Sequence, residues 1–280
     1  MIKNKISIII FFLGIIIFFM NLQYISNYYL NIALFLLSIF LIFAIVIYQI
    51  LSLKNYTFIL FEIFLIFFLL HLIYQLGYFG LRGSDSYLDY NLMKIILNDH
   101  HFSLGTDMLN GWPLLHIFSS IISMVIKIEP LIIAKFIPSF ISSLIVIPLY
   151  LYIYMIYKNE KIALLTCLIF ATIPQFESFT ALLVRETYAI FFFIFFIYLL
   201  YVSKQRENLR LKFLVIILVP VVVLSHHFTS FMLIIFLTIY LINSKLIPFI
   251  FRKTKNEKIV KKDITNFYLI LLFTIFFYLL

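Results

Sequence analysis

The 280-residue sequence has little charge: Asp, Glu, Lys and Arg make up 12% of it, whereas 65% of its residues are hydrophobic. So few charges, with a mean hydropathy of +1.14, exclude an ordinary soluble domain. The chain has one cysteine, Cys167, which excludes an intrachain disulfide. Apolar stretches recur at roughly 17–25 residues, the length that a helix needs to cross a bilayer. The sequence therefore predicts an all-α polytopic membrane protein.

The start of the chain lacks a cleavage site. MIKNKISIIIFFLGIIIFFM has the basic head and apolar run of a signal peptide, but the following NLQYISNYY offers no small-residue cleavage motif. We therefore expect a retained first helix. No internal repeat or low-complexity linker interrupts the remaining chain. Its apolar segments predict nine transmembrane helices, at about residues 6–20, 28–51, 56–77, 131–157, 161–175, 185–202, 211–225, 228–250 and 265–280.

A further apolar segment, PLLHIFSSIISMVIKI, begins at Pro113. As a helix of about 15 residues it would be near 22 Å long, which is short for a span. If it does not cross, the basic loops share the cytoplasmic side with the N-terminus, as the positive-inside rule requires; these loops are 158–161, 203–212 and 251–263. If it crosses, all three move outside together. We therefore expect this segment at the outer membrane interface, the N-terminus in the cytoplasm, and the net charge of +9 to reflect loop charges rather than nucleic-acid binding.

The predicted first large outer loop, 78–128, contains the least apolar long stretch of the chain. Residues 81–116 carry four aspartates, two adjacent histidines and the only tryptophan. Within them, 85–99 is predicted to be a short helix that lies along the membrane surface, because an apolar stripe follows helical spacing at Leu88, Leu92, Ile95 and Ile96. Asp85 and Asp89 stand one turn apart at its start. Either they have a functional role, or they are acids that the helix dipole favours there.

The order of these features resembles the GT-C superfamily of membrane glycosyltransferases. RGSDSYLDYNLMKIILNDHHFS, followed by GWPLLHIFSSIISMVIKIEP, is similar to the branch that contains protein O-mannosyltransferases and aminoarabinose transferases. Asp85 matches the acid that opens the outer loop, Trp112–Pro113 matches a proline segment, and Lys135 stands where a basic residue starts the next span. The resemblance covers roughly residues 75–240. It includes the later IFATIPQFESFTALLVRETYAIFFF and LSHHFTSFML.

The sequence departs from the family in three ways. Leu114 replaces the second proline of the usual pair. Two predicted helices precede the span before the loop, where many relatives have none. The chain ends in LLFTIFFYLL, where many relatives continue. We therefore expect residues 1–280 to form a single GT-C-like transmembrane domain, in a short or C-terminally truncated member.

The resemblance implies transfer of a sugar from a polyprenyl- or dolichyl-phosphate-linked donor to an acceptor at the outer face, with inversion. The acceptor is a protein, a lipid or a glycan. Asp85 is then the candidate base, and Asp89 its helper or a ligand of a divalent ion. Arg185 and Lys135 are the candidates for binding the donor phosphate. Without such a role, these two side chains would only snorkel to anchor their helices.

Four further residues are expected to contact substrate: Glu186, His226, His116 and Trp112. Glu186 either pairs with Arg185 or reaches the acceptor. Neighbouring helical residues point about 100° apart, so neither adjacent histidine pair is a chelate by itself, and hydrogen bonding is the simpler role for them. Carboxylate ligands would suit Mg²⁺ or Mn²⁺. No metal or other cofactor is assigned, because GT-C enzymes with monosaccharide-phosphate donors often need none.

Two alternatives remain open. Glu62 and His71 lie within the third predicted span, and an intramembrane carboxylate is a functional candidate by default, as in a transporter or flippase of lipid-linked sugars. The other candidates gather at one face of the membrane, which favours an interfacial enzyme. The second alternative is an inactive, truncated scaffold.

Overall fold

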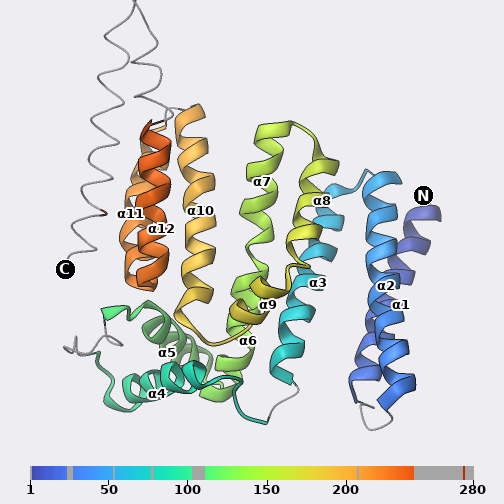
Figure 1. Cartoon of the computed structure of the whole chain (residues 1–280), viewed down its shortest axis with the longest axis horizontal. Coiled ribbons are helices and arrows are strands. Elements are labelled where there is room, and N and C mark those ends of the chain that lie inside the picture. The colour runs from blue at the N-terminus through green and yellow to red at the C-terminus, as the bar shows by residue number, and fades with distance from the viewer. Residues whose placement is uncertain are drawn as a thin grey trace, which may run out of the picture. The chain divides into compact units, whose positions relative to one another are not determined.

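The computed structural model describes residues 2–23, 28–52, 54–76, 79–102, 111–206, 208–242 and 274. These residues form helices and no strands, which confirms the all-α prediction (Figure 1). The helices are α1 (Ile2–Gln23), α2 (Tyr28–Ser52), α3 (Tyr56–Leu76), α4 (Ser84–Asp99), α5 (Leu114–Ile126), α6 (Pro130–Ser143), α7 (Val146–Tyr157), α8 (Glu160–Phe170), α9 (Pro174–Thr180), α10 (Arg185–Arg206), α11 (Leu209–Ser225) and α12 (His227–Leu241). The predicted span 265–280, the end of span 228–250 and the basic loop 251–263 lie outside the described residues.

Four helices in the described part of the chain are long and apolar enough to cross a membrane: Ala33–Ser52, Tyr56–Leu76, Pro130–Tyr157 and Arg185–Arg206. The bent pair α8 and α9 makes a fifth if it counts as one span. Three shorter apolar helices, Ile6–Met20, Leu114–Ile126 and His227–Tyr240, fall below that length. The chain is therefore built of apolar helices suited to a membrane, with four or five spans by this measure. The nine-span arrangement stays a prediction.

The contacts within the chain divide it into two compact units. Unit 1 comprises residues 1–67 and 149–173, and unit 2 comprises 68–148 and 174–280. In unit 1, α2 packs against α1 and α8. In unit 2, α10 packs against α6, α11 and α12. Each unit is assembled from two separate stretches of chain, so no linker in the sequence marks the boundary.

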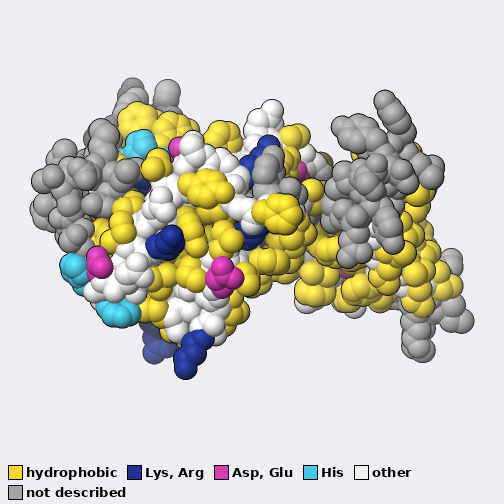
Figure 2. Space-filling model, turned by 90° about the horizontal axis from the view of Figure 1, so that it is seen from below, with side chains coloured by type: hydrophobic (Ala, Val, Ile, Leu, Met, Phe, Trp, Pro, Cys, Tyr) yellow, Lys and Arg dark blue, Asp and Glu magenta, His cyan; other side chains and the backbone are white. Residues whose placement is uncertain are grey.

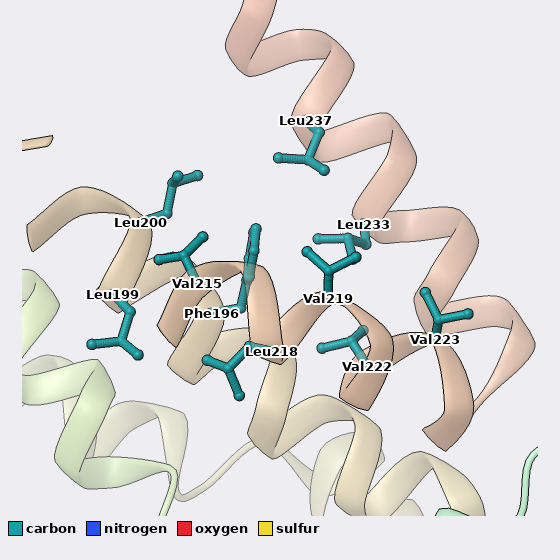
Figure 3. Packing of buried hydrophobic residues seen from close by; sticks show 10 residues of the cluster. All are labelled: Phe196, Leu199, Leu200, Val215, Leu218, Val219, Val222, Val223, Leu233 and Leu237. Atoms are coloured by element: carbon teal, nitrogen blue, oxygen red, sulfur yellow. The ribbon is translucent and has the colours of Figure 1, made fainter. Parts of the chain in front are cut away.

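The core of unit 2 is the packing of α10, α11 and α12 (Figure 3). Three residues of α10, five of α11 and two of α12 interdigitate there: Phe196, Leu199 and Leu200; Val215, Leu218, Val219, Val222 and Val223; and Leu233 and Leu237. Lipid is as apolar as these side chains, so close van der Waals packing, rather than escape from water, holds membrane helices together. This bundle is the rigid base that carries the candidate site.

The helices α4 and α5 lie crosswise at one end of this bundle (Figure 1), where α5 packs against α4, α6, α10 and α11. The entry to α4 depends on Gly83, which adopts a φ of 88° as its N-cap. Ser84 is the first helical residue, and no side chain makes a capping hydrogen bond at this end. The other end of α4 turns at His100, which takes a left-handed conformation.

Both crossing helices turn their polar faces inward. The buried residues of α4 are Ser86, Asp89, Met93 and Ile96, and those of α5 are Leu115, His116, Ser119, Ser120 and Ser123. By contrast, Leu88 and Ile95 of the predicted apolar stripe are 48% and 52% exposed, whereas Ile96 of that stripe is buried, so the stripe does not form one outward face. In α5, Val125 is 75% exposed. Figure 2 looks onto this end and shows hydrophobic side chains on the surface beside charged and histidine side chains. An outward apolar face is what a helix at a lipid surface requires.

Candidate functional site

The centre of the candidate site is a buried carboxylate. Asp89, on α4, is 1% exposed. Its Oδ1 lies 2.9 Å from Nε2 of His116 on α5, and 3.5 Å from Nε of Arg185, the first residue of α10. A buried carboxylate is stable only when it is paired and hydrogen-bonded, and both conditions are met here. Three helices thus meet at one carboxylate oxygen.

A second ion pair continues from the neighbouring residue. Glu186 Oε1 lies 3.1 Å from Nε2 of His226, which precedes α12 and is 5% exposed. The other ring nitrogen of His226, Nδ1, is 3.3 Å from Oγ1 of Thr229. Because Arg185 and Glu186 are adjacent, the start of α10 is tied in one direction to α4 and α5 and in the other to the start of α12.

Aromatic rings extend this arrangement toward the surface. The His226 and His227 rings meet edge to face, with centroids 4.4 Å apart, and the Trp112 ring lies 4.8 Å from that of the exposed His227. We call the connected set the polar network; it consists of Asp89, His116, Arg185, Glu186, His226, His227 and Trp112. It unites six of the eight site residues that the sequence suggested.

The other two predicted site residues have different surroundings. Asp85 lies one turn before Asp89 and is exposed, and its Oδ1 accepts a hydrogen bond of 3.4 Å from the Ser84 hydroxyl. Lys135 lies on α6, and its Nζ donates to the carbonyl oxygen of Phe79 at 3.0 Å. The exposure of Asp85 leaves it able to meet an acceptor from outside, while the role of Lys135 at a donor phosphate stays a prediction.

Sequence reasoning missed three residues that shape the site. The Tyr188 hydroxyl lies 3.1 Å from Oγ of Ser119, which joins α10 to α5, and both residues are fully buried. Tyr188 also belongs to an apolar cluster with Leu81, Leu115, Ala134 and Leu183. The third missed residue is His227. Tyr188 stands three residues after Arg185, one helical turn, and that spacing was the only signal for it.

The guanidinium of Arg185 is the group best suited to bind an anion. Its side chain is 18% exposed, so it reaches the boundary of the buried region. Nε makes the Asp89 contact, and the two terminal nitrogens carry the other four N–H donors of the guanidinium. A planar fork of this kind matches the oxygens of phosphate. The site can therefore hold an anionic group against α10 while Asp89 fixes the arginine.

Few side chains that could bind a metal ion lie close together in the part of the chain that the structure describes. No group of three or more His, Cys, Asp or Glu side chains is arranged there to hold a metal ion. Asp89 is committed to His116 and Arg185. A Mg²⁺ or Mn²⁺ ion at Asp85 and Asp89 stays an open alternative, as it was from the sequence.

Neither a scan against protein-family models nor a search of curated proteins finds a match for this chain. The resemblance to the GT-C superfamily therefore stays a prediction that rests on the order of its sequence features. The functional interpretation depends on the geometry at the end of α10. There, Asp89 of α4, His116 of α5 and Arg185 of α10 meet, and the exposed face of α5 is apolar.

Proposed function

We propose that this protein is a membrane glycosyltransferase of the GT-C type, with nine spans and a cytoplasmic N-terminus. It moves a sugar from a polyprenyl- or dolichyl-linked phosphate to an acceptor hydroxyl at the outer face, with inversion. The observation that carries this proposal is the position of Arg185. A partly exposed guanidinium, anchored by a buried carboxylate, lies beside α5, a helix that turns an apolar face outward. A lipid phosphate combines the same two chemical features.

The proposed reaction uses Asp85, at the start of α4, and Arg185, at the start of α10. The acceptor oxygen attacks the anomeric carbon, and its proton passes to the exposed Asp85 carboxylate. The bond between the anomeric carbon and the phosphate oxygen breaks, and its electron pair remains on the lipid phosphate. Arg185 stabilises the charge that develops there. Asp89 keeps the guanidinium in place and takes no proton in this scheme.

The outward face of α5 supports a lipid-linked donor rather than a soluble one. Ile121, Met124 and Val125 of α5 are 48%, 43% and 75% exposed, and in water such a contiguous surface would be unfavourable. At a bilayer surface the same side chains lie among acyl chains. A prenyl chain then reaches the network laterally, with its phosphate at the depth of Arg185.

One observation favours the alternative of a transporter or flippase. Gln49 Nε2 donates to Glu62 Oε1 at 3.2 Å, and both side chains are fully buried between α2 and α3. An intramembrane carboxyl group is expensive to maintain and often serves ion or substrate movement. Yet no further polar side chain bonds to this pair within the described part of the chain, whereas the polar network connects seven side chains.

The test is sugar transfer from membrane extracts that carry polyprenyl-phosphate sugars. Asp85→Asn keeps the shape of the side chain and removes the base, so we expect transfer to fall at least about 100-fold. Asp99→Asn is the matched control, because Asp99 is an exposed acid on the same helix. Equal transfer by wild type and Asp85→Asn would remove Asp85 from the mechanism. No transfer by wild type, with the donor moved intact across vesicle membranes, would establish a flippase instead.

A further inference from the structure

His116 is fully buried, although it was expected to contact substrate. The residue is 0% exposed, and its Nε2 lies 2.9 Å from Asp89 Oδ1. Its other ring nitrogen, Nδ1, is buried and has no hydrogen-bond partner among the described residues. A side chain so enclosed cannot touch a sugar or a phosphate. Its place in the site must come from what it does to Asp89.

The hydrogen bond determines the protonation of the ring. A carboxylate only accepts hydrogen bonds, so Nε2 carries the proton that points at Asp89. A second proton on Nδ1 would leave a buried donor without an acceptor, which is unfavourable. Nε2 of His116 is therefore the atom that donates to Asp89. Arg185 is then the cation that balances the charge of Asp89.

We infer that His116 is a positioning residue, which orients Asp89 so that this carboxylate holds the Arg185 guanidinium toward a phosphate ligand. The inference rests on the proposed function for the identity of that ligand, the phosphate of a prenyl-linked donor. One oxygen, Asp89 Oδ1, meets both His116 and Arg185. Because the hydrogen bond from His116 holds this oxygen in place, it also holds the contact between the oxygen and Arg185 in place. The long, flexible arginine then loses less conformational freedom when the phosphate binds.

Trp112 provides a direct binding measurement. It is the only tryptophan of the chain, and its ring lies 4.8 Å from that of His227 at the surface end of the polar network. The probe is farnesyl phosphate, titrated into the full-length protein in detergent while tryptophan fluorescence is recorded. Farnesol, which lacks the phosphate, reports contacts of the prenyl chain alone. Inorganic phosphate, added as a competitor, distinguishes a lipid phosphate site from one that takes any free phosphate.

Two substitutions of His116 form a matched pair. In His116→Gln the amide nitrogen reaches the place of Nε2 and can donate to Asp89, whereas in His116→Asn it reaches only the place of Nδ1. Both introduce a buried amide, so folding is affected similarly. Ser86→Ala is the control for packing. Ser86 is fully buried one turn before Asp89 on α4, and its hydroxyl has no partner among the described residues.

We expect His116→Asn to weaken farnesyl phosphate binding about tenfold, which is the lower end of the loss seen at metal sites when the partner of a ligating side chain is removed. His116→Gln should bind within about threefold of wild type, Ser86→Ala should bind like wild type, and farnesol binding should not change in any variant. Wild-type binding of farnesyl phosphate that Arg185→Gln abolishes would show that the phosphate sits at Arg185. Competition by millimolar inorganic phosphate would identify a general phosphate site that the same histidine organises.

Several results would overturn the inference. These are equal binding by His116→Asn and wild type, equal loss in His116→Asn and Ser86→Ala, parallel loss of farnesol binding, or no binding of farnesyl phosphate by the wild type. The proposed function fails separately. Binding that depends on His116, together with no sugar transfer from membrane extracts, would retain the positioning role and exclude the transferase.

Discussion

The two units of this protein treat buried polar groups differently. In unit 1, Gln49 and Glu62 form a buried pair between α2 and α3, while the buried Ser38 donates within its own helix to Phe35. In unit 2, buried polar side chains repeatedly bond to another helix or to the turn after α9. Examples are Asp89 with His116, Ser119 with Tyr188, His71 with Thr180, Gln75 with the carbonyl of Ala181, and Ser120 with the carbonyl of Met93.

The difference favours unit 2 as the location of the functional site. Each unsatisfied polar group in hydrocarbon costs several kcal/mol, so a membrane helix keeps polar residues where they are paired or where function needs them. Among its described residues, unit 1 buries few polar side chains: Ser7, Ser38, Gln49 and Glu62. Unit 2 carries a connected set of charges at one end of its bundle. Substitutions in the two units should therefore have unequal consequences, and four of them measure the contrast.

The largest effect is expected from Arg185→Gln in unit 2. The change leaves Asp89, whose side chain is 2% exposed, without its cation. Breaking a buried ion pair in this way costs about 3–5 kcal/mol, toward the lower end here because His116 still donates to Asp89. The thermal unfolding midpoint in detergent should fall clearly. The double variant Asp89→Asn/Arg185→Gln should recover part of the loss, and an unchanged midpoint in the single variant would remove the basis of the contrast.

The helices were predictable from sequence, but their contacts were not. Apolar runs and helical spacing predicted 85–99 as a helix, and it spans Ser84–Asp99. The single helix predicted at 131–157 is interrupted at Leu144–Ile145, and the segment predicted at 161–175 stops at Phe170 before Pro174 begins a new helix. That second break was signalled, because proline favours the first turn of a helix over its interior.

The candidate site depends on which residues of separate helices meet, and a single sequence does not show this. Asp85 and Asp89 are one turn apart, and only the packing of α4 on α5 decides which of them is buried. Arg185 lies 96 positions after Asp89, and no local pattern predicts that contact. What the sequence could supply was the chemistry: opposite charges gathered at the ends of apolar helices, where charge is tolerated.

A smaller effect is expected from Gly83→Ala, which tests how α4 is positioned. Gly83 has a φ of 88° and a ψ of 143°, a conformation that non-glycine residues rarely adopt, and forcing an alanine into it costs about 1–3 kcal/mol. Space is not the obstacle, because an added Cβ would lie 3.7 Å from its nearest neighbour, Leu182. Gly111→Ala is the control, since an added Cβ would have nothing within 4 Å there. Equal unfolding midpoints for both variants would mean that the entry to α4 relaxes freely.

A still smaller loss should follow Glu186→Gln. The Glu186 side chain is 37% exposed, so its ion pair with His226 is partly screened by solvent and contributes about 1 kcal/mol at most. The neutral amide can still accept a hydrogen bond from His226. We expect a slight fall in the unfolding midpoint and retained farnesyl phosphate binding. A loss as large as that of Arg185→Gln would show that the α12 side of the polar network matters as much as the α4 side.

The smallest effect is expected in unit 1, from Glu62→Gln. The amide oxygen can accept the same hydrogen bond from Gln49, and a neutral group suits the interior of a helix pair better than a carboxylate does. The shift in the unfolding midpoint should correspond to a change of less than about 1 kcal/mol in the free energy of unfolding, and sugar transfer should be retained. Ser38→Ala, at another buried polar position of unit 1, provides the baseline for an inert substitution.

If Glu62→Gln alone abolished transfer, or abolished ion-dependent movement of a lipid-linked sugar in vesicles, the buried pair would be functional. Unit 1 would then contribute to activity, and the transporter would become the better description of the protein.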